Sequence, residues 1–324
     1  MRKKSGAYVH NLGIVFPGQG TQHVGMGSDL HQAFQEARNV YEEACDVLGF
    51  DIQSLCFEGP REELDRTVNT QVAVLTTDMA IYRIFERETG LQPMIMAGHS
   101  LGEYSALCAA GALPFVDALL LVAARGQYQQ EAAPIGTGAM AAVIGLNAAQ
   151  VGALCREVSS NNGAVFPAII NARDQIVISG DLGTIEKAVV RARELGAMRA
   201  LKLPISVPCH CPLLDEAARR FAGDLEGVEL RDFEVDVIPN CDPEATYTRD
   251  SAKDFMVRQV HFPVYWQASI ERMVRRGIDT IVEIGPKRTL TNLTKRIDAG
   301  IRVANVEDMA SLKKTAAWLG ETRS

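Results

Sequence analysis

The chain has 324 residues, 47% of them hydrophobic, and this length is enough to bury a large core as one large domain or as two. Its 33 lysines and arginines stand against 40 aspartates and glutamates, and the formal net charge of −7 argues against nucleic acid as the main partner. Seven cysteines without a CxxC pair, no signal-peptide core and no apolar run of about 18 residues predict a soluble, cytoplasmic protein without a membrane span.

The first part of the chain alternates apolar strands with helical patterns. The expected elements are strands at 12–16 and 94–97 and helical patterns up to about residue 48, around 70–90, at 104–113 and at 115–133. Residues 17–20 (PGQG) follow the first strand and predict a glycine loop at its end. Strands that alternate with helices form mainly parallel sheets covered on both faces. The sequence therefore predicts an α/β fold around a mainly parallel sheet.

Residues 136–208 show a different order of elements. The pattern predicts strands at 140–145, 164–171, 175–180 and 199–207, with helices at 148–160 and 182–196. This βαββαβ order is typical of the ferredoxin-like unit. We therefore expect a small ferredoxin-like subdomain at 136–208, inserted into a large catalytic subdomain made of 1–135 and 209–324.

The last part of the chain returns to the α/β pattern. A helix is expected near 251–275, a strand at 280–284 (TIVEI) and another helix from about residue 288, after the Gly285-Pro286 turn. The chain has no internal repeat and no low-complexity segment.

The sequence GHSLG at 98–102 follows the second predicted strand and precedes a helical stretch. Gly-x-Ser-x-Gly in this context is typical of a nucleophile elbow, in which a tight turn projects the serine from the end of the sheet. The following helix favours negative charge at its N-terminus, and the Leu101 N–H is a natural donor to an oxyanion. The alternative is that Ser100 only caps the helix, since short matches of this kind also arise by chance.

A nucleophilic serine needs a base, and the chain has six histidines. His210 stands between Pro208 and Pro212, which would hold its loop rigidly, and it is the first candidate, with a structural role as the alternative. His23 and His261 stay open as bases. The other three are expected to lie in the terminal segment (His10), on a solvated helix face (His31) and in packing beside the serine (His99). Cys209-His210-Cys211 is too tight for an ordinary zinc site, so no metal is expected.

Seven segments together resemble the malonyl-CoA:acyl carrier protein transacylase family, which loads extender units in fatty-acid and polyketide synthesis. They are FPGQGTQHVGMG (16–27), GHSLGEYSAL (98–107), ARG (124–126), GTGAMAAVIGL (136–146), LPISVPCHC (203–211), VRQVHFPVYW (257–266) and VEIGPKRTLTNLTKRI (282–297). They occur in the family's order and cover nearly the whole chain beyond residue 11. The resemblance implies a hydrolase-like α/β core with a ferredoxin-like insertion.

The resemblance also implies an activity and a set of roles. A malonyl or related carboxyacyl group moves from CoA to the phosphopantetheine thiol of an acyl carrier protein by a ping-pong acyl-serine mechanism, without a cofactor besides the CoA thioester substrate. The implied roles are Ser100 as nucleophile, His210 as base, the N–H groups of Gln19 and Leu101 as oxyanion hole, Arg125 on the malonate carboxylate and the Gln259 carbonyl on the histidine. No aspartate or glutamate stands out as a third member of a triad.

Cys209 departs from the family pattern, because a serine usually precedes the catalytic histidine. The resemblance places this position, with His99, in the acyl pocket. Malonyl stays the default acyl group, methylmalonyl or ethylmalonyl stays open, and an inert buried cysteine is the alternative. Carrier proteins are acidic as a class, so basic residues near the EIGPKR turn are candidates for docking one: Lys287, Arg288, Lys295 and Arg296. We expect a monomer.

Three other functions are compatible with parts of this pattern. A serine hydrolase or thioesterase would share Ser100 and His210, but Arg125 argues against it, because a neutral acyl group would leave a buried guanidinium unpaired. A non-catalytic module that binds carrier proteins would be expected to lose Ser100 or His210, and both are present. A trans-acting polyketide synthase acyltransferase with a branched extender would use the same chemistry.

Overall fold

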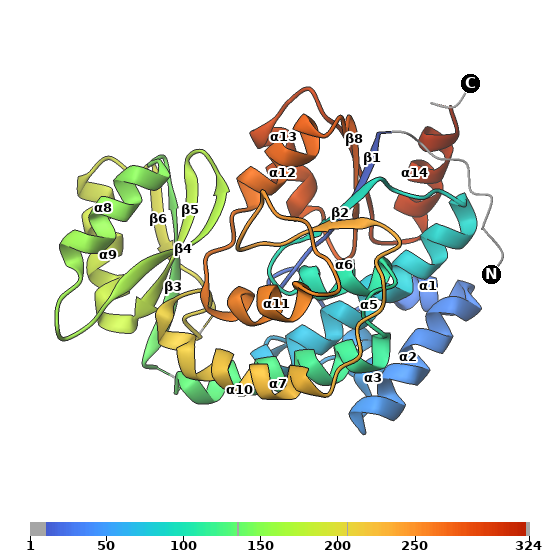
Figure 1. Cartoon of the computed structure of the whole chain (residues 1–324), viewed down its shortest axis with the longest axis horizontal. Helices are drawn as coiled ribbons and strands as arrows, with labels where there is room; N and C mark the ends of the chain where they lie inside the picture. The colour runs from blue at the N-terminus through green and yellow to red at the C-terminus, as the bar shows by residue number, and fades with distance from the viewer. Residues whose placement is uncertain (1–10, 135, 206, 322–324) are drawn as a thin grey trace.

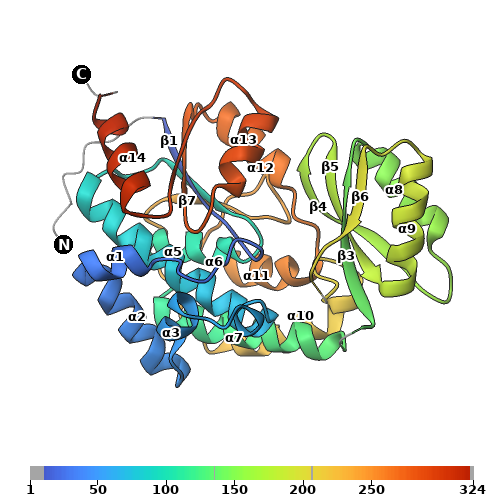
Figure 2. The same ribbon diagram turned by 180° about the vertical axis from the view of Figure 1, so that it is seen from behind.

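The computed structural model describes residues 11–134, 136–205 and 207–321, and it contains two separate sheets (Figure 1). One sheet is parallel and lies among most of the helices. The other is antiparallel and lies at one end of the molecule with two helices, α8 and α9, on its outer side (Figure 2). Within the described part of the chain, none of the helices has the length and apolar character needed to cross a membrane.

The larger part is built on a five-stranded parallel sheet in the order β7-β2-β1-β8-β9. Its strands are β1 (Leu12–Phe16), β2 (Ile95–Gly98), β7 (Asp236–Ile238), β8 (Thr280–Ile284) and β9 (Arg302–Val306). The predicted strands at 12–16 and 280–284 are confirmed, and β2 lies one residue later than expected. Strands β7 and β9 had not been predicted, because β7 has only three residues and β9 (RVANV) is only partly buried.

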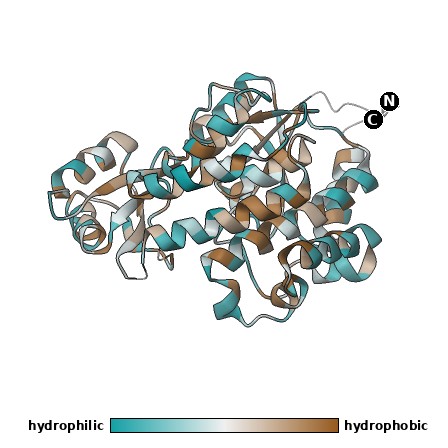
Figure 3. Cartoon of the chain, turned by 60° about the horizontal axis from the view of Figure 1, so that its bottom comes forward, coloured by the Kyte–Doolittle hydropathy of each residue, from teal (hydrophilic) through white to brown (hydrophobic). Residues whose placement is uncertain are grey.

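Helices cover both faces of this sheet, as expected for a parallel sheet. Alternate residues of a strand point to opposite faces, so Ile14 of β1 packs with the helices of one layer and Val15 with those of the other. The first layer contains α5 (Thr67–Thr89), most of whose residues are buried. Figure 3 shows hydrophobic residues gathered on the helices at the centre of the larger part. The remaining helices of the larger part are α1 (Ser28–Ala33), α2 (Gln35–Leu48), α3 (Ile52–Phe57), α4 (Arg61–Leu64), α6 (Gly102–Ala109), α7 (Phe115–Ala132), α10 (Asp215–Glu226), α11 (Ala252–His261), α12 (Trp266–Arg275), α13 (Thr289–Ile297) and α14 (Met309–Glu321), with a short 3₁₀ turn, η1, at Pro212–Leu214.

The prediction of a single helix near 251–275 is wrong. The chain forms α11 and α12 instead, and a short extended connection between them contains Pro263. Proline cannot donate a backbone hydrogen bond and clashes with the preceding helical turn, so the helix ends before it. Val264 in this connection exchanges backbone hydrogen bonds with Ala168 and Ile170 of the antiparallel sheet, which ties the two sheets together.

The smaller part is a four-stranded antiparallel sheet in the order β4-β5-β3-β6. Its elements follow one another as β3 (Gly138–Ile144), α8 (Ala148–Val158), β4 (Val165–Ala172), β5 (Gln175–Asp181), α9 (Leu182–Glu194) and β6 (Arg199–Lys202), which is the predicted order. One face packs on α8 and α9 around a core of its own. The predicted strand at 199–207 is too long, because β6 ends at Lys202 before Pro204, and residue 206 lies outside the described residues.

Candidate active site

Ser100 stands on a tight turn between the buried strand β2 and helix α6. Its backbone φ is 54°, a left-handed conformation that is costly for a residue with a side chain. The two motif glycines are sterically required: a Cβ on Gly98 would lie 1.9 Å from Gly102 backbone atoms, and one on Gly102 would lie 2.2 Å from the Phe16 carbonyl oxygen. The motif therefore forms the predicted elbow. The capping interpretation of Ser100 is wrong, because the N-cap of α6 is Leu101, no side chain caps this helix end, and Ser100 Oγ contacts His210 instead.

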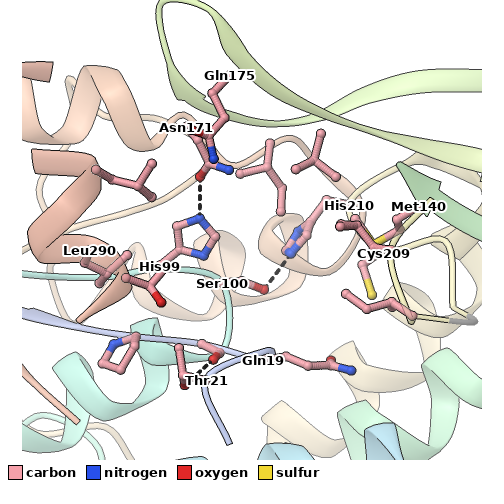
Figure 4. A pocket seen from close by; sticks show the side chains of 18 residues that line it. Gln19, Thr21, His99, Ser100, Met140, Asn171, Gln175, Cys209, His210 and Leu290 are labelled. Atoms are coloured by element: carbon pink, nitrogen blue, oxygen red, sulfur yellow. Dashed lines mark hydrogen bonds between the residues drawn. The ribbon is translucent and has the colours of Figure 1, made fainter. Parts of the chain in front are cut away.

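The Ser100 side chain contacts the imidazole of His210. Ser100 Oγ lies 2.6 Å from His210 Nε2, and His210 Nδ1 lies 3.0 Å from the Gln259 carbonyl oxygen (Figure 4). A carbonyl only accepts, so Nδ1 carries the proton and Nε2 is free to accept from the serine hydroxyl. Ser100, His210 and Gln259 come from three distant segments of the chain, and all three were predicted to belong to one site.

The environment of His210 favours its neutral form. The side chain is 1% exposed, and burial, followed by the positive charge of Arg125, lowers the pKa of His210 to about 3. The carbonyl of Gln259 opposes this effect. The imidazole of His210 is therefore unprotonated at Nε2 at neutral pH.

Among residues 11–134, 136–205 and 207–321, no histidine other than His210 forms a hydrogen bond with the Ser100 hydroxyl. His261 Nδ1 lies 2.6 Å from Asp215 Oδ1 at the surface, and His23 Nδ1 lies 3.4 Å from the Thr21 carbonyl oxygen. His31, which was expected to be solvated, is half-buried, and it packs edge-on against the rings of Tyr41 and Phe57. His10 lies outside the described residues.

His99 lies beside the site and points away from the serine hydroxyl (Figure 4). Its Nε2 is 2.8 Å from Asn171 Oδ1 of β4, and its ring packs edge-on against Trp266 of α12. Burial lowers the pKa of His99, so this imidazole is neutral as well. His99 thus joins the elbow to β4 of the small sheet, in agreement with the predicted packing role.

Arg125 is a buried cation whose hydrogen-bond acceptors are neutral side-chain amides and whose guanidinium lies over the Tyr104 ring. The side chain is 2% exposed and lies on α7. Its Nη1 donates to Gln71 Oε1 at 2.7 Å, its Nη2 donates to Gln259 Oε1 at 3.1 Å, and its Nε has no hydrogen-bond partner. Among the residues that the structure describes, no carboxylate forms an ion pair with this guanidinium. A buried arginine without an acidic partner is suited to bind an anionic ligand.

Gln259 connects Arg125, Ser100 and His210. Its side-chain Oε1 accepts from Arg125, its Nε2 donates to the Ser100 carbonyl oxygen at 2.5 Å, and its backbone carbonyl accepts from His210. The prediction concerned only the backbone carbonyl. The additional side-chain contacts link the guanidinium directly to the elbow.

A cavity of about 180 Å³ opens onto Ser100 and His210. Its walls come from both sheets, because the inner face of the antiparallel sheet contributes Met140, Ile169 and Val177. Further lining residues are Pro17, Gly18, Gln19, Thr21, His99, Asn171, Gln175, Leu203, Ile205, Cys209, Thr289, Leu290 and Leu293. The apolar contribution of the small sheet had not been predicted, since no local pattern shows which face of an inserted unit turns inward.

Cys209 lines this cavity beside His210, as predicted, and is 7% exposed. Burial raises the pKa of the Cys209 thiol to about 11, so it stays protonated and behaves as a small apolar side chain. Cys209 is therefore part of the wall of the cavity, with its thiol protonated at neutral pH.

The glycine loop after β1 lies directly against the elbow. A Cβ on Gly18 would lie 2.3 Å from the His99 carbonyl oxygen and 3.5 Å from the Leu101 nitrogen, so only glycine permits this approach. Thr21 Oγ1 donates to the Gly18 carbonyl oxygen at 2.8 Å and stabilises the loop. Gln19 lines the cavity, and its side chain turns away to donate to Thr67 Oγ1. The backbones of the two predicted oxyanion donors thus belong to adjoining segments.

The residues that sequence reasoning missed include Asn240 and Gln71. Asn240 donates to the Gly98 carbonyl oxygen and accepts from the Ser100 N–H, and Gln71 is a ligand of Arg125. The one available signal for Asn240 is its place just after a strand, because the carboxyl ends of parallel strands meet at the same edge.

The four basic residues proposed for docking have different surroundings. Arg296 is paired with Asp174, and Lys287 Nζ donates to the Gly20 carbonyl oxygen at 3.0 Å. Arg288 and Lys295 are exposed and line a separate cavity of about 280 Å³ between α13, β9 and α14.

The chain is similar to proteins of known activity. The acyl transferase domain family matches residues 14–316. A malonyl CoA-acyl carrier protein transacylase of Escherichia coli O157:H7 is 44% identical over 284 residues, which are 88% of this chain and 92% of that protein. Two solved structures are also similar. One is a type II polyketide synthase acyl-carrier protein in complex with its malonyl-transacylase, PlMCAT:AntF, with a TM-score of 0.92 and 42% identity over 95% of this chain and 99% of that one. The other is an acyl carrier protein S-malonyltransferase from Vibrio cholerae, with a TM-score of 0.90 and 42% identity over 94% and 99% of the two chains.

Proposed function

This chain belongs to the family of malonyl CoA-acyl carrier protein transacylases, and we propose that it performs their reaction through a covalent intermediate on Ser100. The enzyme transfers a malonyl group from CoA to an acyl carrier protein. The observation that carries the proposed mechanism is the 2.6 Å contact between Ser100 Oγ and the neutral His210 Nε2 at the wall of a cavity.

Substrate binding starts with the free carboxylate of the malonyl group, which pairs with Arg125. The planar guanidinium can donate two parallel hydrogen bonds to a carboxylate, and burial makes this pair strong. In the absence of substrate, amide oxygens of Gln71 and Gln259 occupy Nη1 and Nη2, so the carboxylate replaces neutral acceptors with a charged one. This exchange favours carboxyacyl groups over neutral acyl groups.

The first half of the reaction forms the acyl-enzyme. His210 Nε2 takes the hydroxyl proton while Ser100 Oγ attacks the thioester carbonyl carbon. Negative charge develops on the carbonyl oxygen, and the backbone N–H groups of Gln19 and Leu101 stabilise it. The tetrahedral intermediate collapses, the carbon–sulfur bond breaks, and the CoA thiolate leaves with the proton from His210.

The second half repeats these steps with a different thiol. His210 takes the proton of the phosphopantetheine thiol, and the sulfur of that thiol attacks the carbonyl carbon of the malonyl-serine ester. The ester bond breaks, Ser100 recovers its proton from His210, and malonyl leaves on the carrier protein. These steps use only side chains of this chain and the two thiols, so we propose no cofactor.

Several finer assignments belong to the same proposal. We assign residues 1–135 and 209–324 to a hydrolase-like subdomain and 136–208 to a ferredoxin-like one, supported by the βαββαβ order and the antiparallel sheet order. All seven cysteines are free thiols, in agreement with a cytoplasmic location. The carrier serves fatty-acid or polyketide synthesis, and the basic surface around Arg288 and Lys295 is a candidate to dock it.

Intact-protein mass spectrometry tests the proposed function. The enzyme is mixed separately with malonyl-, methylmalonyl-, ethylmalonyl- and acetyl-CoA and is then chased with a carrier protein from each pathway. A malonyl adduct on Ser100 that moves to the carrier is the expected result. An adduct that is lost to water supports the hydrolase alternative, and a preference for a branched acyl group supports a trans-acting polyketide synthase acyltransferase.

Substitution of Arg125 is expected to change the acyl preference. Arg125→Ala removes one partner of a buried charge pair, a loss of about 2–5 kcal/mol, so malonyl transfer should fall roughly 30-fold or more while acetyl transfer is unchanged or rises. Arg125→Lys keeps the charge without the paired donors and should be intermediate. The measurement is kcat/KM with malonyl-CoA and acetyl-CoA, with Arg219→Ala on the exposed face of α10 as the matched control. An unchanged malonyl-to-acetyl ratio would contradict the role.

The low pKa of His210 predicts an unusual pH profile. An ordinary histidine of pKa 6.5 would be about nine-tenths protonated at pH 5.5, which lowers the rate roughly tenfold. Because the pKa of His210 is lowered to about 3, the base stays unprotonated, and kcat/KM for acyl-enzyme formation should be flat from pH 7 to pH 5.5. A fall centred near pH 6.5 would show that the base has an ordinary pKa.

The lowered pKa of His210 also makes the free energy of unfolding depend on pH. A histidine whose folded pKa is lowered binds its proton more readily in the unfolded chain, so stability decreases as the pH falls below about 6.5. Circular dichroism at each pH separates this loss from a loss of rate.

A further inference from the structure

The side-chain amide of Asn240 binds the backbone groups that flank His99 in the elbow. Asn240 Nδ2 donates to the Gly98 carbonyl oxygen at 2.6 Å, and Oδ1 accepts from the Ser100 N–H at 2.7 Å. Asn240 is 1% exposed and follows β7, the strand whose Ile238 pairs with Ala97 of β2. Its amide therefore continues the ladder of hydrogen bonds at the point where β2 becomes the elbow.

A buried carboxyl group holds Asn240 in turn. Glu103 Oε2 accepts from the Asn240 backbone N–H at 2.7 Å, and Oε1 accepts from the Tyr247 hydroxyl. Glu103 is 1% exposed and lies in the first turn of α6, three residues after the nucleophile. The GHSLGEY motif contains this glutamate, and the catalytic steps give it no task.

We propose that Asn240 is a positioning residue for the nucleophile and that Glu103 and Tyr247 hold it in place, an inference that rests on the proposed role of Ser100. A left-handed φ such as that of Ser100 persists only where the surroundings determine it. The Asn240 amide restrains the peptide groups on both sides of residue 99, and thereby keeps Ser100 Oγ within 2.6 Å of His210. A displacement of the reacting atom by about 1 Å costs roughly 100-fold in rate.

A purely structural role makes a different prediction. If Asn240 only satisfied buried backbone groups, its loss would lower the melting temperature and leave the kcat of the folded molecules unchanged. A positioning role lowers kcat and leaves KM for malonyl-CoA unchanged, because Asn240 is not among the residues that line the cavity and reaches it only through the Ser100 backbone.

The decisive experiment measures the rate of acyl-enzyme formation by rapid quench with malonyl-CoA. For Asn240→Ala we expect kcat to fall roughly 10- to 100-fold, with KM within about twofold of the parent. Asn240→Asp has nearly the same shape, accepts from the Ser100 N–H and has no donor for the Gly98 carbonyl, so its kcat should also fall. The stability control is Leu312→Ala, a buried residue of α14, which should lower the melting temperature without changing kcat.

A second pair of variants tests the support from Glu103. In Glu103→Gln the amide oxygen can accept from the Asn240 N–H and the NH₂ can donate to the Tyr247 oxygen, so kcat should be close to that of the parent. Glu103→Ala removes both contacts and should resemble Asn240→Ala. This pair also decides the question if Asn240→Ala does not fold.

Two results would overturn the inference. One is a folded Asn240→Ala enzyme with the parent kcat, and the other is a loss of kcat that follows the melting temperature in all variants, Leu312→Ala included. The parent enzyme is labelled in parallel. If the parent does not form malonyl-Ser100, the proposed function is refuted. If the parent and Asn240→Ala form it at the same rate, only the positioning role is refuted.

Discussion

Replacement of Ser100 by alanine is expected to abolish the acyl-enzyme and to lower malonyl transfer by roughly 10⁴-fold or more. Ser100 Oγ is the atom that lies 2.6 Å from the neutral base, and it borders the cavity in which a thioester would lie. Alanine has the same backbone preferences at φ 54° to a first approximation, so the elbow and the fold should persist. The loss is therefore chemical.

The measurement is the mass of the intact protein after mixing with malonyl-CoA, followed by peptide mapping. Ser105→Ala is the matched control, since Ser105 lies on α6, the helix that follows the elbow, and donates to Asp78 instead of contacting His210. It should keep the adduct, even if the protein becomes less stable. A malonyl adduct on Ser100→Ala at the parent level would refute the assignment of the nucleophile.

Replacement of His210 by alanine is expected to lower kcat by roughly 10²- to 10⁴-fold, with little change in KM. The loss removes the acceptor of the serine proton, and no other imidazole among the described residues contacts Ser100 Oγ. Arg125 remains available for the carboxylate, so binding of malonyl-CoA should persist. Nucleophile and base act as a unit, and the double variant with Ser100→Ala should be no slower than Ser100→Ala alone.

His261→Ala is the control for this experiment. His261 lies on α11 at the surface and pairs with Asp215, an exposed interaction that contributes at most about 1 kcal/mol to stability. It should retain the parent rate. If His210→Ala were near-normal instead, His261 and His23 would have to be tested as the base.

Much of the fold follows from local patterns in the sequence. The strands at 12–16 and 280–284 are fully buried, so they appear as continuous apolar runs between loop signals. The antiparallel unit could be predicted because its strands are short and apolar, whereas its helices are longer and show helical periodicity. Strands β7 and β9 escaped notice because short or partly exposed strands carry little of this pattern.

The chemistry of the site was predictable where a local constraint carries it. Ser100 is marked by glycines that pack against backbone, and His210 by the prolines beside it. Asn240 was not predicted, since the short strand before it was not recognised and its role depends on contacts with the Gly98 carbonyl and the Ser100 N–H, 142 and 140 positions earlier. Such contacts depend on the order of the strands in the sheet, and a single sequence does not encode that order locally.

The orientation of His210 by the Gln259 carbonyl has a genetic consequence. Gln259 lies in the last turn of α11, where carbonyl groups lack partners within the helix and carry the negative end of its dipole. In a serine enzyme whose base is oriented by an aspartate, one codon change removes the orienting group. Here every amino acid at position 259 supplies a backbone carbonyl oxygen, so a point mutation does not remove the group that orients His210. Selection at this codon therefore acts on the side chain, which contacts Arg125 and Ser100.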